Sequence, residues 1–338
     1  MPNDVQLKRP RRGVVVLAGC CAVAAVAVAT NSLAQSPVTS YPSKPLRYIV
    51  PFPAGGSPDI VGRLLADRLS RIWGQQVVVD NRSGAGGTIG AAIGARAAPD
   101  GYTLFQCNIA SNAIAASLYA KLPYDTLRDF APVSRIGTTA SALVVHPSMP
   151  FESVAEFIAY AGANPGKLSY GSSAAGTSPH LAMELFKTMA RIDVVHIAYK
   201  GAAPALADLI AGQVPVSVSN IPAVLSPVQS GRMRALAVTG ATRASQLPSV
   251  PTMIEAGLTG YEVTSWYGVC APAGTPAPVL GKLHADLIRV LLAPDVQQRL
   301  NDLVVDVAPT SREDFAAFIS AETRRWAQVV KDAGLARQ

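Results

Sequence analysis

Two short stretches of the chain, 121 residues apart, share the same order of glycine, serine and proline. Residues 55–60 read Gly-Gly-Ser-Pro-Asp-Ile, and residues 176–181 read Gly-Thr-Ser-Pro-His-Leu. Serine followed by proline is typical of a helix start, with Ser57 and Ser178 as the predicted N-caps. A helix start carries unpaired backbone N–H groups and the positive end of the helix dipole, which favour an anion. Good turn chemistry explains either copy alone, whereas the recurrence predicts two helix starts that hold one small anion between them.

A titratable residue follows each of these prolines, and each has two interpretations. Asp59 is placed either to interact with the positive end of its helix dipole or to accept a hydrogen bond from a ligand amine, a ligand hydroxyl or an ordered water. His180 is placed either to contact the ligand or to cap its helix start toward solvent. Both alternatives stay open from the sequence.

Further candidate donors follow later strand-like runs. Tyr199 precedes a helix pattern, so its hydroxyl and the backbone N–H groups of Gly201 and Ala202 are placed to donate to a ligand. Lys200 is expected to be a solvated charge at the rim of the site, where a lone lysine usually lies. Asn220 ends an apolar run and is expected to point to the same crevice.

The elements that must position these residues alternate between strand and helix patterns, which predicts an α/β fold with parallel sheets flanked by helices. Ligands in such folds bind at the carboxyl ends of the strands, where both glycine loops lie. Helical periodicity is clear over residues 60–72 and 181–189, then over 276–291 and 311–330, where Ser311 is the predicted cap. The predicted strands are 46–50, 76–79, 103–105, 142–145, 168–170, 194–197, 214–218 and 235–238.

The first 34 residues have the pattern of a secretory signal peptide. Basic residues at 8–12 precede an apolar stretch over 13–29, and a small-x-small cleavage site ends at Ala34. A lipoprotein box ending at Cys20 is the alternative, but its apolar segment is short and continues past the cysteine. The pattern therefore predicts export, cleavage after Ala34 and a periplasmic location.

Charge and cysteine content narrow the function. The 338 residues carry a net charge of +7, and removal of 1–34 leaves 25 basic and 21 acidic residues, a net of +4, with no basic run interleaved with aromatics. Nucleic-acid binding is therefore not expected. Cys107 and Cys270 remain in an oxidising compartment, where they either pair or lie as separate buried thiols.

Several catalytic and metal chemistries lack their motifs. The glycine run at 84–90 has Ile89 where a dinucleotide fingerprint needs its third glycine. No Gly-x-Ser-x-Gly elbow occurs, and Ser172 and Ser173 have no evident His-Asp pair. The four histidines lack metal-ligand spacing. We therefore expect no catalytic residues, no metal and no cofactor.

Six motifs together resemble the Bug family, the extracytoplasmic receptors of tripartite tricarboxylate transporters. The resemblance covers essentially the whole chain after the signal peptide and differs at residues 108–112. The motifs lie, in family order, at residues 51–59, 81–88, 164–168, 176–181, 199–206 and 271–276.

This resemblance implies a two-lobe periplasmic-binding-protein fold of the Venus-flytrap, type II-like kind, with two sheets flanked by helices. The lobes are expected at 41–138 plus 268–338 and at 139–267, with the chain crossing near 137–143 and 264–271. The lobes would close on a small organic acid held by backbone N–H groups, hydroxyls and bridging waters, and a monomer would deliver it to membrane permease subunits. Phe52 is expected in the pocket wall, and Trp266 either there or in the core. The expected ligand-binding residues are Phe52, Ala54, Gly55, Gly56, Ser57, Asp59, Gly86, Asn108, Ser172, Ser173, Gly176, Thr177, Ser178, His180, Tyr199, Gly201 and Asn220.

Two other functions remain open from the sequence. An orphan receptor of the same fold could feed a signalling sensor in place of a transporter. A secreted hydrolase using Ser172 or Ser173 is disfavoured, because no base accompanies either serine in the sequence.

The signal-peptide interpretation makes a prediction about the mature chain. We expect the periplasmic fraction to yield a protein that begins at Gln35, because Ser32 and Ala34 supply the small residues of the cleavage site. Intact-mass measurement and N-terminal sequencing check this. An acylated chain that begins at Cys20 would contradict it.

Overall fold

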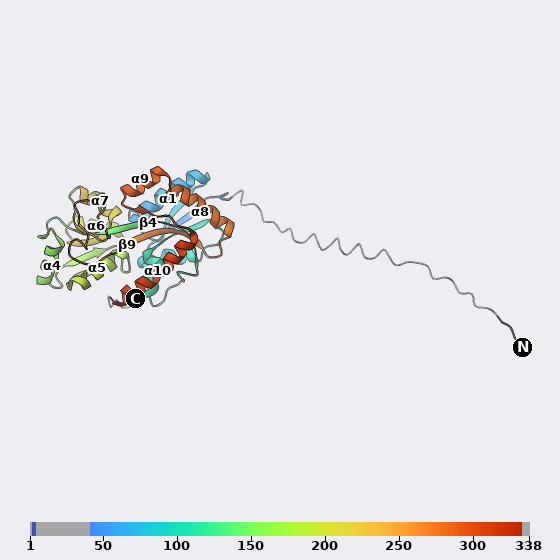
Figure 1. Ribbon diagram of the computed structural model, residues 1–338, viewed down its shortest axis with the longest axis horizontal. Helices are drawn as coiled ribbons and strands as arrows, with labels where there is room; N and C mark the ends of the chain where they lie inside the picture. The colour runs from blue at the N-terminus through green and yellow to red at the C-terminus, as the bar shows by residue number, and fades with distance from the viewer. Residues whose placement is uncertain (1, 5–40, 333–338) are drawn as a thin grey trace. The chain divides into compact units, whose positions relative to one another are not determined.

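The computed structural model describes residues 2–4 and 41–332 (Figure 1). The predicted signal peptide, its cleavage site after Ala34 and Cys20 lie outside the described residues, apart from residues 2–4. Strands and helices alternate along the described chain, and the strands order as β2-β1-β3-β9-β4-β7-β5-β6, with β8 and β10 also paired to β4.

One half of this sheet combines three strands near the start of the chain with two strands from its last quarter. β1 pairs in parallel with β2 and β3, and β3 pairs antiparallel with the late strand β9. β1 is buried along almost its whole length, since residues 48–50 are no more than 1% exposed. The strands of this half are β1 (Leu46–Val50), β2 (Val77–Asn81), β3 (Thr103–Asn108), β9 (Thr264–Pro272) and β10 (Asp306–Val307).

The other half is built from the middle of the chain. β5 pairs in parallel with β6 and β7, while β7 and β8 pair antiparallel with the long strand β4. The strands are β4 (Phe130–Val145), β5 (Ser169–Ser172), β6 (Val195–Ala198), β7 (Val216–Asn220) and β8 (Arg234–Val238).

Two long strands join the halves. β4 pairs with β9 over residues 130–140 and with β7 over 141–145, so it changes partner between Ala140 and Ser141. The expected crossings at 137–143 and 264–271 lie in β4 and β9. The expectation of parallel pairing is wrong here. β4 carries the chain from the first half to the second and β9 carries it back, so the two neighbours run antiparallel.

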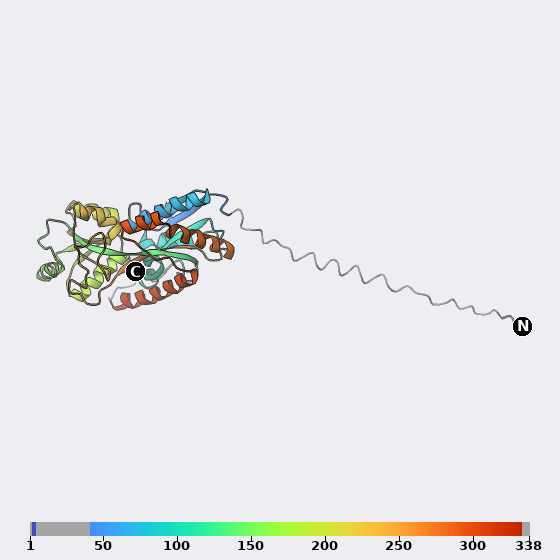
Figure 2. The ribbon, with the colours of Figure 1, turned by 45° about the horizontal axis from the view of Figure 1, so that its top comes forward.

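The helices group by the half of the sheet that they cover. Helices α4 to α7 gather around one end of the sheet and α1, α8, α9 and α10 around the other, with β4 and β9 running between them (Figures 1 and 2). Their bounds are α1 (Ser57–Trp73), α2 (Thr88–Ala95), α3 (Ala115–Leu118), α4 (Val154–Ala163), α5 (Ser178–Ala190), α6 (Ala202–Ile210), α7 (Ile221–Gln229), α8 (Ala277–Leu291), α9 (Pro294–Asp302) and α10 (Arg312–Asp332). A 3₁₀ turn (Ala85–Gly87) precedes α2, and a π-helical segment (Ala110–Ile114) precedes α3.

Helix starts largely follow the sequence signals. Ser311 accepts a hydrogen bond from the backbone N–H of Asp314, as expected of the cap of α10. Pro276 is the N-cap residue of α8, and leucines 280, 283, 287 and 291 of this helix are buried in the core. The 3.6-residue period of these leucines therefore does mark the buried face of α8.

A disulfide ties β3 to β9. Cys107 and Cys270 are joined, both are fully buried, and 163 residues separate them in the sequence. Of the two states left open by the sequence, the structure has the pair. The bond fastens the returning strand to the first half of the sheet beside the residues of β3 and β9 that face the pocket described below.

Loss of this disulfide should destabilise the protein by about 2–4 kcal/mol, because the unfolded chain regains the freedom of a long loop. We expect the midpoint of urea unfolding to fall when dithiothreitol is added. The double variant Cys107→Ala, Cys270→Ala is the matched control, since its lower midpoint should not respond to dithiothreitol. Equal midpoints for oxidised and reduced wild-type protein would contradict a stabilising role.

Candidate functional site

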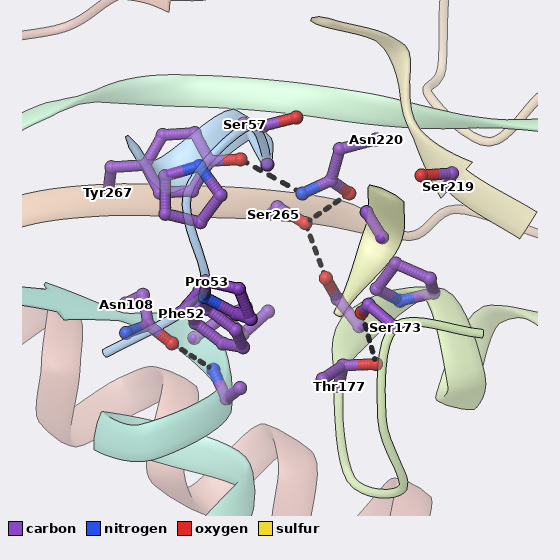
Figure 3. Close-up of a pocket in the computed structure, with 17 residues that line it drawn as sticks. Phe52, Pro53, Ser57, Asn108, Ser173, Thr177, Ser219, Asn220, Ser265 and Tyr267 are labelled. Carbon is purple, nitrogen blue, oxygen red and sulfur yellow. Dashed lines mark hydrogen bonds between the residues drawn. The ribbon is translucent and has the colours of Figure 1, made fainter. Parts of the chain in front are cut away.

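A pocket lies where loops from both halves of the sheet meet (Figure 3). Its walls come from segments after β1, β3, β5 and β6, from the last residues of β3 and β7 and from alternate residues of β9, so most of it stands at the carboxyl ends of strands. The lining residues are Phe52, Pro53, Gly56, Ser57, Pro58, Asn108, Ile109, Ala110, Ser173, Thr177, Ser178, Pro179, Ala202, Ser219, Asn220, Ser265 and Tyr267.

Two helix starts, those of α1 and α5, form opposite parts of the wall. The cap and first helical residue of each helix, Gly56 and Ser57 in α1 and Thr177 and Ser178 in α5, line the pocket, and their backbone N–H groups have no acceptor within the helix. The prolines that follow, Pro58 and Pro179, have no N–H to offer. The predicted N-caps were wrong by one residue, since Gly56 and Thr177 occupy the caps and Ser57 and Ser178 are the first helical residues. Neither serine side chain caps its helix. Each serine already has a helical backbone, and the residue after it is a proline at the second helical position. The donors left free are therefore backbone N–H groups, which suit an anion.

A chain of hydrogen bonds orients the polar side chains of the pocket (Figure 3). Asn220 Oδ1 accepts from the hydroxyl of Ser265 at 3.0 Å and from that of Ser141 at 2.8 Å. Because the proton of Ser265 is used in this way, Ser178 must donate in its short hydrogen bond to Ser265. Asn220 Nδ2 donates to the hydroxyl of Tyr267 at 2.9 Å.

This arrangement gives Tyr267 a defined role in the pocket. Its hydroxyl oxygen accepts from Asn220, so its own proton is not needed for that bond and is available to donate. Burial raises the pKa of Tyr267, so the group stays protonated at neutral pH. Tyr267 therefore adds a neutral donor to those of the helix starts.

No lining residue carries a charged side chain. The cation nearest to this site in sequence, Lys200, lines an adjoining hollow with Gly86, Tyr199 and Gly201, and its side chain is exposed. Phe52, Pro53 and Ser173 line both spaces. An anion in the pocket would thus be held by N–H groups and hydroxyls.

The expected site residues fall into three groups. Those that line the pocket are Phe52, Gly56, Ser57, Asn108, Ser173, Thr177, Ser178 and Asn220. Those that line the adjoining hollow are Gly86, Tyr199 and Gly201. The remaining six, Ala54, Gly55, Asp59, Ser172, Gly176 and His180, lie on or behind the two glycine loops and line neither space.

Asp59 uses its carboxylate on its own loop. It accepts hydrogen bonds from the backbone N–H of Gly55 at 3.0 Å, from Arg63 Nε at 3.0 Å and from Asn81 Nδ2 at 2.9 Å. Burial acts to raise the pKa of Asp59, but these bonds and the charge of Arg63 outweigh it and hold the pKa below its usual range. The carboxylate is therefore a fixed anion of the loop.

His180 is buried and contacts a second histidine. Its Nδ1 accepts from the backbone N–H of Gly176 at 3.2 Å, and its ring stacks on that of His196 with centroids 4.1 Å apart. Burial lowers the pKa of both rings, that of His196 to about 4. Neither ring lines the pocket.

The expectation that no base accompanies Ser172 is wrong. Its hydroxyl lies 2.7 Å from His196 Nε2, a pair hidden from sequence reasoning because it joins neighbouring strands 24 residues apart. Ser172 is nevertheless fully buried and does not line the pocket, so it is not placed to attack a bound molecule.

Sequence reasoning placed the backbone N–H of Ala202 at the site, and Ala202 lines the pocket, but it missed eight other lining residues. Ser265 and Tyr267 alternate along β9, and the expected crossing at 264–271 combined with the two-residue period of a strand could have found them. Trp266, between them, lies in the core and donates to Glu322 at 3.1 Å. The missed residues are Pro53, Pro58, Ile109, Ala110, Pro179, Ser219, Ser265 and Tyr267.

Metal-binding clusters and membrane-spanning helices are both absent from the described residues. Across residues 41–332, no three histidine, cysteine, aspartate or glutamate side chains are grouped so that they could hold a metal ion. In the same part of the chain, every helix is too short or too polar to cross a membrane.

Comparisons with known proteins give one consistent result. A family model described as the tripartite tricarboxylate transporter family receptor matches residues 61–335. The structure of R. palustris Rpa4515 with adipate has a TM-score of 0.85 and 39% identity, covering 88% of this chain and 99% of that one. The periplasmic binding protein BugD has a TM-score of 0.85 and 34% identity, covering 88% and 100%. MatC from Rhodopseudomonas palustris with bound malate has a TM-score of 0.82 and 32% identity, covering 86% and 100%. These neighbours confirm the predicted α/β periplasmic-binding-protein fold, although the strands of the described residues join in one ten-stranded sheet and not in the two sheets expected.

The lowered pKa of His196 predicts a loss of stability in acid. The unfolded chain takes up a proton near pH 6.5 and the folded chain only near pH 4, so the free energy of unfolding falls as the pH drops through this window. We expect wild-type protein to lose about 1 kcal/mol more than His196→Gln between pH 7 and pH 5, after allowance for solvent screening. Urea unfolding at both pH values measures this. An equal loss in the two proteins would show that His196 does not carry it.

Proposed function

We propose that this chain, which belongs to the tripartite tricarboxylate transporter receptor family, is an extracytoplasmic receptor that binds a small organic carboxylate and delivers it to a membrane transporter. The predicted resemblance to the Bug family is confirmed, because the receptor family model matches this chain and BugD is among the solved structures similar to it. The observation that carries the carboxylate proposal is the pocket itself, which faces two helix starts with their free N–H groups.

The chemistry of the pocket supports a carboxylate of modest size. The N–H groups of α1 and α5 and the hydroxyl of Tyr267 are donors, and a carboxylate offers about four lone-pair sites to accept from them. Phe52, Ile109 and several prolines supply apolar wall for a short carbon chain. Rpa4515 with adipate and MatC with malate are relatives whose ligands have these properties.

Contacts from both halves of the sheet would let the ligand stabilise a closed state. The loop after β1 and Asn108 come from one half, and the loop after β5 and Asn220 come from the other. A ligand that bonds to both favours the closed arrangement by its extra contacts there. We take residues 41–138 plus 268–338 and residues 139–267 as the two closing lobes.

The setting of the receptor follows from the predicted signal peptide and the family. We place the mature chain in the periplasm of a Gram-negative cell, as a monomer whose partners are the permease subunits of a tripartite tricarboxylate transporter. Delivery to a signalling sensor is the alternative, and neighbouring genes for a large and a small membrane subunit would favour transport. We propose no catalytic activity, since the buried Ser172 lies outside the pocket and Ser173, which lines it, donates to the hydroxyl of Thr177 and not to a base.

The test of this function is stabilisation by a ligand. We expect one or a few members of a panel of mono- and dicarboxylates that includes adipate and malate to raise the melting temperature. A ligand at 100 times its dissociation constant adds about 2.7 kcal/mol. Stabilisation by sugars or metal ions alone would contradict the proposal.

Two variants then separate backbone recognition from charge recognition. Gly56 has an ordinary extended backbone, and an added Cβ would meet nothing nearer than 3.7 Å, so Gly56→Val should fold. We expect this variant to weaken binding more than tenfold by crowding the N–H groups of α1. Lys200→Ala should change affinity less than about fivefold, as for a screened charge. Tight binding by Gly56→Val together with loss of binding by Lys200→Ala would show that Lys200 is the anchor.

A further inference from the structure

The same hydrogen bond occurs once in each glycine loop. Asp59 is the third residue of α1, and its Oδ2 accepts from the backbone N–H of Gly55 at 3.0 Å. His180 is the third residue of α5, and its Nδ1 accepts from the backbone N–H of Gly176 at 3.2 Å. The two acceptors are 121 residues apart, as are the two glycines, and both acceptors are buried, at 3% and 6% exposure.

Each of these bonds spans the residue that caps its helix. Gly55 and Gly176 have φ of +82° and +75°, so the chain turns sharply there before it reaches the caps Gly56 and Thr177. Both caps line the pocket, whereas Asp59 and His180 do not. The bond from the third helical residue back to the glycine therefore fixes the shape of the turn that presents the free N–H groups.

We propose that Asp59 and His180 are matched positioning residues for the ligand site, and that protonation of His180 releases the second loop while the first stays held. This inference rests on the proposed carboxylate-binding function. Two residues behind the pocket then fix the shape of the two loops, and only the loop held by His180 responds to acid.

The release follows from the tautomer of His180. An imidazole whose Nδ1 accepts a hydrogen bond carries its single proton on Nε2, so a second proton must go to Nδ1. That nitrogen then becomes a donor that faces the N–H donor of Gly176, and the bond is lost. Asp59 behaves differently, because even a protonated carboxyl keeps an oxygen that can accept from Gly55.

The charges around the two acceptors are opposite in sign. Four residues after Asp59, Arg63 pairs with its carboxylate. Four residues after His180, Glu184 favours the protonated ring, while Lys187 of the same helix disfavours it. Glu184 is itself engaged, since Lys187 pairs with it and the hydroxyl of Tyr170 donates to it at 2.7 Å.

Two rings from neighbouring strands complete the surroundings of His180. His196 of β6 stacks on it at 4.1 Å, and Tyr170 of β5 stacks on the far face of the pair, at 4.8 Å from His196. Burial is the largest influence and lowers the pKa of His180, so the ring is neutral at pH 7 and takes up a proton only in acid. Stacking on His196 further opposes two charged rings at once.

The experiment compares two substitutions at one position. His180→Asn places Oδ1 where Nδ1 lies, so it keeps an acceptor for Gly176 that does not titrate. His180→Leu removes the acceptor. The first readout needs no ligand: exchange of the Gly176 amide hydrogen, corrected for its intrinsic rate, followed by NMR between pH 7.5 and pH 4.5, with the Gly55 amide as the internal control.

We expect wild-type protein to lose protection of Gly176 in acid while Gly55 keeps it. His180→Asn should keep both amides protected, and His180→Leu should leave Gly176 unprotected at every pH. Equal protection of Gly176 in wild-type protein at pH 7.5 and pH 4.5 would overturn the release. If His180→Leu does not fold, the comparison of wild type with His180→Asn still decides the question.

The second readout is affinity for the carboxylate that gives the largest melting shift in the adipate and malate panel. We expect the wild-type affinity to fall at least fivefold more than that of His180→Asn over the same pH range, since titration of the ligand itself cancels between the two. Parallel curves would overturn the positioning role. Absence of binding by wild type at pH 7.5 would instead overturn the proposed function. Exchange of the Gly176 amide would still test whether His180 holds its loop in a pH-dependent way.

Discussion

An anion held without a cation needs several neutral donors at one point, and the rest of this structure serves that requirement. Each helix start contributes roughly 0.3–1 kcal/mol toward a nearby negative charge, and up to about 2 kcal/mol when partly buried, so one start alone is a weak site. Two starts and the hydroxyl of Tyr267 share the pocket only because β4 and β9 bring both halves of the sheet to the same place. The positions of those two strands therefore determine whether the donors act together.

Close approach between the halves depends on glycines with positive φ. A Cβ on Gly176 would lie 2.5 Å from Leu118 Cδ2, and one on Gly201 would lie 2.8 Å from Pro53 Cγ. Both glycines have φ above +70°, which other residues rarely adopt. The glycines of these loops therefore serve two purposes, since they turn the chain toward the helix starts and leave room for the opposite loop.

Local signals in the sequence were enough for most elements and for the part of the site that is contiguous with them. The residues at 56–57 and 177–178 could be placed because a strand, a glycine loop and a Ser-Pro helix start follow one another within a few positions. The direction of β9 and the pairing of Ser172 with His196 depend on strands that meet only after folding, so no local pattern encodes them. Asp59 and His180 are a third case. The sequence singled out both residues as possible ligand contacts, but in the structure they accept hydrogen bonds from the backbone of their own loops.

The return of the chain through β9 also sets the order in which the molecule can be completed. A polypeptide emerges from the ribosome, or from a membrane pore, with its N-terminus first. β3 is formed from residues 103–108, yet its neighbour on one side comes from residues 264–272, so that edge stays unpaired until most of the chain has emerged. Ser265 and Tyr267 arrive on the same strand. Arrival of β9 therefore completes the first half of the sheet, its disulfide and the part of the pocket wall formed by Ser265 and Tyr267. A chain truncated before β9 has neither a complete core nor a complete site.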